Sequence, residues 1–294
     1  MKWTTKITKL TGIKYPVIMG AFAGIGRAKF AAAFSNAGGL GIITALNFSK
    51  LKKFKEELEL MEELTTKPYG INFTVAPPMM AEKNPKARTE DTYIDYLNLA
   101  IDYGVKFFTS SAYKASKLGD LIHERGGYWF HKCSTIPHAQ SAEKDGADAV
   151  TLVGIEGTGF KNPTQQTSLI NITIGKKLLV IPIIAAGGFG EARGFLAALT
   201  MGAEAVCFGT AIMATKECPA PASFKNRLIN QDIFDEEYYK KIYHFQLKDK
   251  MIWSPASGHS EKILTMDEFM RKIIVGAEDL LKNLGFNNSE FKTL

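Results

Sequence analysis

Short apolar segments rich in β-forming residues alternate with amphipathic segments of helix length along most of this chain, and eight such units can be counted. The interval from one apolar segment to the next is roughly 20 to 35 residues, enough for a strand, a loop and a crossover helix. This alternation is typical of a parallel sheet covered by helices. The predicted strands are residues 17–21, 40–44, 70–75, 105–110, 127–132, 148–153, 181–185 and 204–208.

The sequence also marks the ends of several helices. Glycine follows three of them, at Gly38, Gly146 and Gly202, and glycine is a common helix stop. Pro137 stands in the first turn of one of these helices, a position where proline is favoured. The predicted helices with the clearest ends are 28–37, 49–64, 135–145 and 191–201.

Eight units without a repeat period favour a closed (β/α)8 TIM barrel, an α/β fold, with an open doubly wound sheet as the alternative. Barrels of about 250 residues are common, so the 294 residues of this chain need only one. The alternation stops near residue 221, and a mostly helical segment follows without a linker-like composition. We therefore predict a barrel over residues 1–220 and a helical C-terminal extension over 221–294 that packs on it. The irregular insert at 253–260 is a candidate cover for the mouth of the barrel.

Composition excludes several other classes of protein. Hydrophobic residues make up 46% and charged residues 22%, close to the averages of globular chains. The three cysteines form no CxxC pair, and His131 and His138 lack a carboxylate at a ligand spacing, so we expect neither a disulfide framework nor a metal site. The longest apolar stretch, 178–186, is shorter than the roughly 20 residues of a membrane-spanning helix. The first ten residues lack the apolar core of a signal peptide, so we expect a cytoplasmic protein without a membrane partner.

The formal net charge of +6 comes from one part of the chain. Residues 1–67 hold 11 basic and 5 acidic side chains, and the rest of the chain is balanced. Lysines within 50–55 precede glutamates within 56–59 at helical spacing, which indicates a solvated helix face. No nucleic-acid-binding motif accompanies this charge, so the expected partner is a small-molecule substrate and not nucleic acid. The oligomeric state stays open, with a homodimer among the alternatives.

Glycine-rich turns follow the seventh and eighth predicted strands. Gly187 and Gly188 precede a predicted helix, and Gly209 and Thr210 follow the last strand. In TIM barrels these two loops commonly bind phosphate through backbone N–H groups. The alternative is that both are only tight turns. The glycines at 24 and 26 do not form a dinucleotide-binding fingerprint, because the third glycine and the acidic residue of that motif are missing.

Three polar side chains stand at or near the ends of predicted strands. Asn72 lies in an apolar strand, so it is either a satisfied core group or an amide that faces a ligand. Lys132 ends the fifth strand and either binds a negatively charged ligand or is solvated. Glu156 follows the sixth strand and could act as a base, as a hydrogen-bond acceptor or only as a loop charge.

Several motifs in one register resemble the nitronate monooxygenase family, formerly called 2-nitropropane dioxygenases, which is related to the flavin-dependent enoyl-acyl carrier protein reductases. The resemblance covers about residues 13–217 and fades in the C-terminal extension. The matching segments are Pro16-Val-Ile-Met-Gly-Ala-Phe-Ala-Gly24, Ala33-Phe-Ser-Asn-Ala-Gly-Gly-Leu-Gly41, Gly70-Ile-Asn-Phe73, Asp145-Gly-Ala-Asp-Ala-Val150, Ile184-Ala-Ala-Gly-Gly188, Met201-Gly-Ala-Glu-Ala-Val206 and Gly209-Thr210.

The resemblance implies that the barrel binds FMN as its cofactor. It implies that the isoalloxazine ring faces the backbone of a short loop after the first strand, and that other residues contact the polar edge of the ring or the phosphate. The residues so implied are Gly20, Ala21, Phe22 and Ala23 for the ring, Asn72, Lys132, Glu156 and Gly157 for its surroundings, and Gly187, Gly188, Gly209 and Thr210 for the phosphate.

One departure from the family concerns the loop after the sixth predicted strand. The family commonly carries a histidine where this chain has Phe160, and a phenyl ring accepts no proton. His131, His259 or Glu156 would have to replace that histidine as a base. We predict Lys132, Glu156 and His131 as the catalytic residues.

The resemblance implies an FMN-dependent oxidoreductase that oxidises alkyl nitronates with O2 to a carbonyl compound and nitrite. A nitronate is already an anion, so its oxidation needs no base. One alternative is a reductase that takes hydride from NAD(P)H and passes it to an enoyl thioester or a quinone. Another is a flavin-binding protein without the chemistry of the family, as the loss of the histidine suggests.

Overall fold

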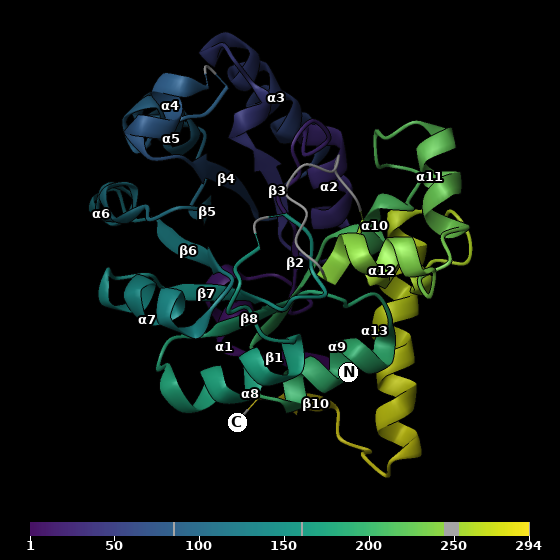
Figure 1. The fold of residues 1–294 in the computed structure, drawn as a ribbon. Coiled ribbons are helices and arrows are strands. Elements are labelled where there is room, and N and C mark those ends of the chain that lie inside the picture. The colour runs from purple at the N-terminus through teal and green to yellow at the C-terminus, as the bar shows by residue number, and fades with distance from the viewer. Residues whose placement is uncertain (85, 160, 244–252, 294) are drawn as a thin grey trace.

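The computed structural model describes residues 1–84, 86–159, 161–243 and 253–293. Eight parallel strands lie at its centre and helices surround them (Figure 1). Each strand lies within two residues, at both ends, of a segment predicted from the sequence. The strands are β2 (Val17–Met19), β3 (Gly41–Thr44), β4 (Tyr69–Val75), β5 (Phe107–Ala112), β6 (Tyr128–Cys133), β7 (Ala149–Val153), β8 (Ile183–Ala186) and β9 (Ala205–Phe208).

The sheet closes on itself. Its strand order is β2-β9-β8-β7-β6-β5-β4-β3, and β2 also meets β3 through a parallel bridge between Ile18 and Leu40. At this bridge Leu40 N donates to Val17 O at 3.0 Å, and Met19 N donates to Leu40 O at 2.9 Å. The fold is therefore the predicted (β/α)8 TIM barrel, and the open sheet is excluded.

Helices cover the outward face of the strands, and side chains inside the barrel bury the inward face. All five residues of β7 are buried, for example. The four helices predicted with clear ends are α2, α3, α7 and α9, each within two residues of its predicted ends. The helices are α1 (Lys6–Thr11), α2 (Ala28–Asn36), α3 (Leu51–Leu64), α4 (Pro78–Lys83), α5 (Glu90–Asp102), α6 (Ser116–Glu124), α7 (Ile136–Lys144), α8 (Ser168–Leu178), α9 (Ala192–Thr200), α10 (Thr210–Met213), α11 (Ala222–Ile229), α12 (Glu236–Tyr243) and α13 (Met266–Asn283).

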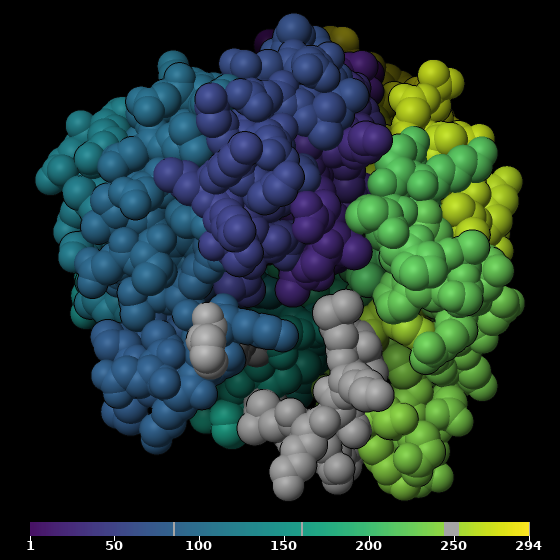
Figure 2. Space-filling model, turned by 90° about the horizontal axis from the view of Figure 1, so that it is seen from above, coloured from purple at the N-terminus to yellow at the C-terminus, as the bar shows by residue number. Residues whose placement is uncertain are grey.

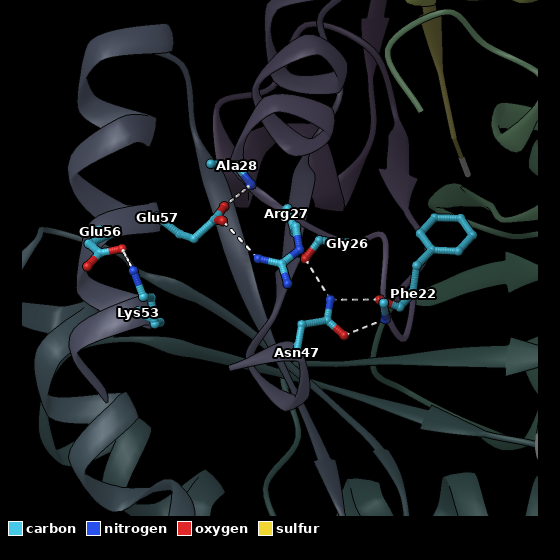
Figure 3. Close-up of polar contacts among 9 residues, drawn as sticks. Phe22, Gly26, Arg27, Ala28, Asn47, Lys53, Glu56 and Glu57 are labelled. Atoms are coloured by element: carbon cyan, nitrogen blue, oxygen red, sulfur yellow. Dashed lines mark hydrogen bonds and ion pairs between the residues drawn. The ribbon is translucent and has the colours of Figure 1, made fainter. Parts of the chain in front are cut away.

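The lysine-rich face of α3 is solvated, as predicted. Lys53 forms an ion pair with Glu56 at 2.7 Å, and Lys55 forms one with Glu59 at 3.4 Å (the first pair is drawn in Figure 3). All four side chains are exposed. None of the described helices is both long and apolar enough to cross a membrane.

The C-terminal part is mostly helical, and its longest helix completes the barrel. Helix α13 packs against α9 and α2, the helices on either side of the gap that follows β9. The ring of Phe269 on α13 meets Phe208 of β9 edge to face, with 5.3 Å between the centroids. The predicted boundary at residue 220 therefore falls between β9 and the helix that covers it.

The first and last strands of the chain pair with each other. Strand β1 (Lys2–Thr4) pairs in parallel with β10 (Glu290–Lys292). Trp3 lies between the rings of Phe195 on α9 and Phe291 on β10, with centroid distances of 5.2 and 5.1 Å. The chain after residue 221 is thus joined to the barrel at α9, β9 and the N-terminus.

If α13 is an integral helix of the barrel, Phe269→Ala will lower the free energy of unfolding by about 3 to 5 kcal/mol, the usual cost of deleting a buried ring. The matched control Phe234→Ala removes a ring that is 89% exposed and should change this free energy by less than about 0.5 kcal/mol. Urea titration followed by circular dichroism and tryptophan fluorescence measures both. A separate early transition for the C-terminal part, with the barrel transition unchanged, would contradict the integral role.

Candidate active site

The loop after β2 is fastened by an asparagine from the next βα unit. Asn47 Nδ2 donates to Phe22 O at 3.0 Å and Gly26 O at 3.1 Å, and Asn47 Oδ1 accepts from Gly24 N at 2.6 Å (Figure 3). Phe22 N also donates to Thr44 Oγ1 at 2.9 Å. These four hydrogen bonds fix the backbone of the loop. The sequence offered no signal for Asn47, since an asparagine after a strand is ordinary in a turn.

A carboxylate from α3 completes the start of α2. Arg27, at the N-cap position, makes no side-chain cap. Glu57 instead accepts from Ala28 N at 2.7 Å and from Arg27 Nη1 at 3.1 Å (Figure 3). A negative charge at a helix N-terminus is favourable, so this pair fixes the far end of the same loop.

The predicted ring-contact residues lie at the accessible rim of the barrel. Gly20 N donates to Phe208 O at 2.8 Å, and a Cβ at Gly20 would lie 3.2 Å from the same oxygen. Gly20 therefore lets β2 approach the end of β9 closely. Ala21 and Ala23 are exposed and Phe22 is half-buried.

Asn72 on β4 is buried, and its amide is held by Thr109 of the neighbouring strand β5 and by Thr74 of β4 itself. Its Nδ2 donates to Thr109 Oγ1 at 3.0 Å and to Thr109 O at 3.3 Å. Thr74 Oγ1 donates to Asn72 Oδ1 at 3.0 Å. Both amide donors and one acceptor position are thus occupied by protein groups, which fixes the orientation of the amide.

Lys132 on β6 points into the barrel. Its charge acts on Cys207 of β9, and because two strands separate β6 from β9 in the sheet, this electrostatic interaction reaches across the interior. Burial lowers the pKa of Lys132 from 10.5, and burial raises the pKa of Cys207 to about 11. Within the described residues no acceptor lies within hydrogen-bond or ion-pair distance of Lys132 Nζ. The side chain of Lys132 is half-buried. An ammonium that is partly withdrawn from water without a partner is disfavoured, so this group suits a negatively charged or electron-rich ligand.

His131 lies on the opposite face of β6, away from Lys132, and its catalytic role stays a prediction. Neighbouring residues of a strand point to opposite faces, so an inward Lys132 turns His131 outward. His131 Nδ1 lies 2.7 Å from Ser110 Oγ, and its ring is 5.7 Å from that of Trp129. Trp129 in turn packs on Gly119 of α6, where a Cβ would lie 2.3 Å from the indole. Burial in this outer layer lowers the pKa of His131 to about 4.

Glu156, in the loop after β7, is bound to the start of α8. Ser168 N donates to Glu156 Oε2 at 2.9 Å, and Ser168 Oγ lies 2.9 Å from the same oxygen. Ser168 Oγ also lies 2.8 Å from Gly187 O, so these contacts join the loop to the end of β8. A Cβ at neighbouring Gly157 would lie 2.5 Å from Val153, so this turn is tightly packed.

Lys161 is a cation of this loop that the sequence reasoning missed. Its Nζ donates to the carbonyl oxygens of Ile155 and Gly157. Burial lowers the pKa of Lys161 to about 8, with a further lowering by the charge of Lys132 and an opposing effect of Glu156. A lysine in a polar loop carries no pattern that separates it from an ordinary solvated side chain. Phe160, the residue before it, lies outside the described residues.

The turns after β8 and β9 form an anion cradle. The two strands pair directly, with Ala186 opposite Cys207. Gly187 and Gly188 have φ values of +99° and +78°, which glycine adopts without strain. In the described parts of the chain, the backbone N–H groups at 187, 188, 209 and 210 donate to no protein acceptor. A Cβ at Gly209 would meet nothing within 4 Å, so there is open space beside this turn.

The C-terminal segment is anchored beside this cradle. Ser254 N donates to Thr210 Oγ1 at 2.9 Å, so the hydroxyl of Thr210 holds the segment while its amide stays free. Tyr238 OH donates to Trp253 O at 2.7 Å. On α12, Tyr243 interacts with Glu156, which together with burial raises the pKa of Tyr243. The green helices near residues 222–243 and the purple N-terminal segments flank a hollow whose floor is teal (Figure 2).

A separate cavity lies behind the cradle. Its volume is about 590 Å³, and it is bounded by α10, α13 and the segment after Pro255–His259. His259, one of the predicted substitutes for the family's base, lines this cavity and lies against Gly190. Across the described residues, no group of three or more His, Cys, Asp and Glu side chains could hold a metal ion.

These features suit a flavin mononucleotide. Four free amides at neighbouring turns fit a phosphate, since they offer donors and need no positive side chain. The half-buried ammonium of Lys132, which has no partner among the residues that the structure describes, fits an electron-rich ring edge. The accessible backbone of the loop after β2 fits a flat ring.

Comparison with known proteins agrees with this chemistry. A model of the nitronate monooxygenase family matches residues 4–242. Nitronate monooxygenase from Pseudomonas aeruginosa is 32% identical to this chain, over 76% of the chain and 73% of that enzyme. A (3aS,4S,5R,7aS)-5-hydroxy-7a-methyl-1-oxo-octahydro-1H-indene-4-carboxyl-CoA dehydrogenase from Mycobacterium tuberculosis is 30% identical, over 78% of the chain and only 61% of that protein. The crystal structure of FabK from Thermotoga maritima has the same fold, with a TM-score of 0.81 and 23% identity over 96% of this chain and 98% of FabK.

Removal of the Asn47 side chain tests how the loop after β2 is held. Asn47→Ala should lower the free energy of unfolding by about 1 to 3 kcal/mol, because it leaves backbone groups of this loop unpaired. It should also speed hydrogen exchange at the Gly24 amide, which Asn47 Oδ1 now protects. The exposed Asn288 supplies the control variant Asn288→Ala. Unchanged exchange at Gly24 would show that the loop does not depend on Asn47.

Proposed function

This chain belongs to the nitronate monooxygenase family of flavin-dependent oxidoreductases, and from this premise we propose that it uses FMN to oxidise alkyl nitronates with O2. The products would be a carbonyl compound and nitrite. The observation that carries the proposal is the arrangement of Lys132 and the anion cradle: within the described residues, the ammonium has no partner and the four amides at the rim donate to no protein acceptor. The amides would bind the phosphate of the flavin, and the ammonium would lie near negative charge at the other end of the cofactor.

The residues of the site divide the work of binding FMN. In this proposal the amides at 187, 188, 209 and 210 hold the phosphate, and the loop 20–23 lies along the ring. Asn72 presents an amide whose orientation is fixed by Thr74 and Thr109. Bound FMN would supply the electron acceptor that passes reducing equivalents from the substrate to O2.

In this proposal the ammonium of Lys132 balances the negative charge of the substrate. The half-buried ammonium is disfavoured without a counter-charge, as the lowered pKa of Lys132 reports. A nitronate anion, or negative charge on the reduced cofactor, restores a favourable pairing. Binding of an anion should therefore raise the pKa of Lys132 and draw a proton onto it.

A second candidate function is supported by one of the relatives. The mycobacterial protein is named as a dehydrogenase of a coenzyme A thioester. A reductase that takes hydride from NAD(P)H and transfers it to an enoyl thioester or a quinone would use the same flavin site. Rapid anaerobic bleaching of the flavin by NADH or NADPH would favour this function.

The decisive experiment is aerobic turnover of propyl-2-nitronate by fully FMN-loaded protein, with nitrite measured as product. Lys132→Met should lower kcat/KM by about 10- to 100-fold, because loss of a hydrogen bond to a charged group costs about 1.5 to 3 kcal/mol. Lys282→Met, on the exposed side of α13, should match the wild type. No detectable nitrite from the loaded wild type would refute nitronate oxidation, and a flavin that neither substrate class turns over would indicate a binding protein without this chemistry.

Gly209→Ala tests the anion cradle separately from catalysis. The new methyl group enters open space, and a urea titration of the variant checks that it folds like the wild type. The same methyl group would crowd a phosphate on the amides and weaken FMN binding by about 10-fold or more. Riboflavin lacks the phosphate, so its affinity should change much less. Equal weakening of both ligands, measured by fluorescence titration, would show that the phosphate does not bind there.

A further inference from the structure

The cavity behind the anion cradle has the size of a site for a small organic molecule. Its volume is about 590 Å³, and such sites commonly measure about 300 to 1,000 Å³. Gly190 and Ala211 line it, and they follow the two turns whose amides form the cradle. Among the described residues, neither Lys132 nor the loop 20–23 lines it. The cavity is therefore distinct from the flavin site but shares a wall with the phosphate turns.

The inner wall of the cavity is apolar. Ala211, Ala214 and Phe269 line it, and each is 5% exposed or less. Val275 also lines it and is 49% exposed, so the apolar surface reaches water. A ligand with a hydrocarbon part would cover this surface, and its binding would be favoured because apolar area is removed from water on both sides.

The charged side chains that line the cavity leave two ammonium groups available to an anion. The carboxylate of Glu268 is engaged by its own helix, since it accepts from Thr265 N at 2.7 Å. Arg271 pairs with Asp267 at 2.9 Å. Lys272 Nζ donates to His259 O at 3.2 Å and keeps further N–H groups. Lys262 forms no ion pair within the part of the chain that the structure describes. The lining cations are Lys262, Arg271 and Lys272, and the lining carboxylates are Glu261 and Glu268.

One short segment connects the cavity to both turns of the cradle. Ser254 is the N-cap of the short helix Pro255–His259, and its N–H donates to Thr210 Oγ1 at 2.9 Å. His259 lines the cavity, and its Cδ2 lies 3.1 Å from the position of a Cβ at Gly190. A ligand held between α13 and this segment would therefore stabilise the positions of both turns.

We propose that this cavity is an effector site for a small amphipathic carboxylate. The hydrocarbon part of the ligand covers the apolar wall, and its carboxylate meets Lys262 and Lys272. Occupancy holds the segment 254–259 against α13 and so strengthens binding of FMN at the cradle. By thermodynamic linkage, FMN strengthens binding of the carboxylate by the same factor. The coupling rests on the proposed FMN site, whereas binding of the carboxylate does not.

Octanoate serves as the probe, and 1-octanol is its neutral counterpart with the same number of carbons. In calorimetric titration of the protein as purified, octanoate should bind, and 1-octanol should bind about 10-fold or more weakly because it offers no carboxylate. The amide NMR signals of Gly190 and Val275, which both line the cavity, should shift with octanoate. Shifts confined to Lys132 and the loop 20–23 would place octanoate inside the barrel and overturn the proposal.

Three variants test the site. Lys262→Met/Lys272→Met should weaken octanoate by about 10-fold or more and keep 1-octanol within about threefold of the wild type. Val275→Trp adds a ring at a lining position that is 49% exposed, and it should weaken both ligands. The matched control Lys53→Met/Lys55→Met removes two exposed lysines of α3 and should change neither. Urea titration checks that each variant folds like the wild type.

The coupling is read from the affinity for FMN, measured by fluorescence titration with and without saturating octanoate. Octanoate should tighten FMN binding about fivefold or more in the wild type and much less in Lys262→Met/Lys272→Met. Octanoate affinity that is unchanged in this variant and in Val275→Trp would overturn the site. Weaker FMN binding with octanoate would overturn the coupling, and so would no change. Octanoate binding at the cavity of a protein that does not bind FMN would support the site and refute the proposed function.

Discussion

Closure of the parallel barrel is the constraint on which the site depends. Strand β2 bonds to β9 on one side and to β3 on the other, so all eight strand ends converge on one rim. The polar groups of the site lie far apart in sequence and come together only because their strands end at this rim. Lys132 and Cys207 show this directly, since their electrostatic interaction reaches across the interior from β6 to β9.

Local charge, and not the net charge of the chain, defines the chemistry of this rim. The excess of basic residues lies in residues 1–67, and lysines of α3 such as Lys53 are exposed and paired. At the rim, Lys132 is one half-buried cation, and the amides at 187, 188, 209 and 210 add partial positive charge without any ion. A few groups that are withdrawn from water can therefore make a site that attracts anions. Each such charge interacts with a bound anion much more strongly than a charge on a solvated surface does.

The sequence predicted the fold well because strand burial on both faces leaves a clear apolar segment for each strand. It predicted less where the outcome depends on what a segment packs against. The amphipathic pattern of α13 predicts that one face of the helix is buried. It does not predict that this face packs on β9. Side chains alternate between the two faces of a strand, so His131 must point outward if Lys132 points into the barrel. The sequence does not show which of the two points inward, because a shift of one residue would reverse their directions. Asn47 and Lys161 act through backbone groups, which leave no trace in the pattern of side chains.

The loop after β7 shows how structural contacts give two nearby ionisable groups different environments. Glu156 and Lys161 stand five residues apart in one loop, and both are partly withdrawn from water. The carboxylate of Glu156 accepts from the backbone N–H of Ser168 and lies within hydrogen-bond distance of its hydroxyl, at the start of α8. The amine meets two carbonyls, which accept its N–H groups in either state, and a neighbouring lysine that disfavours its charge. Glu156 therefore anchors the loop to the start of α8, whereas Lys161 has a pKa lowered to about 8 by burial.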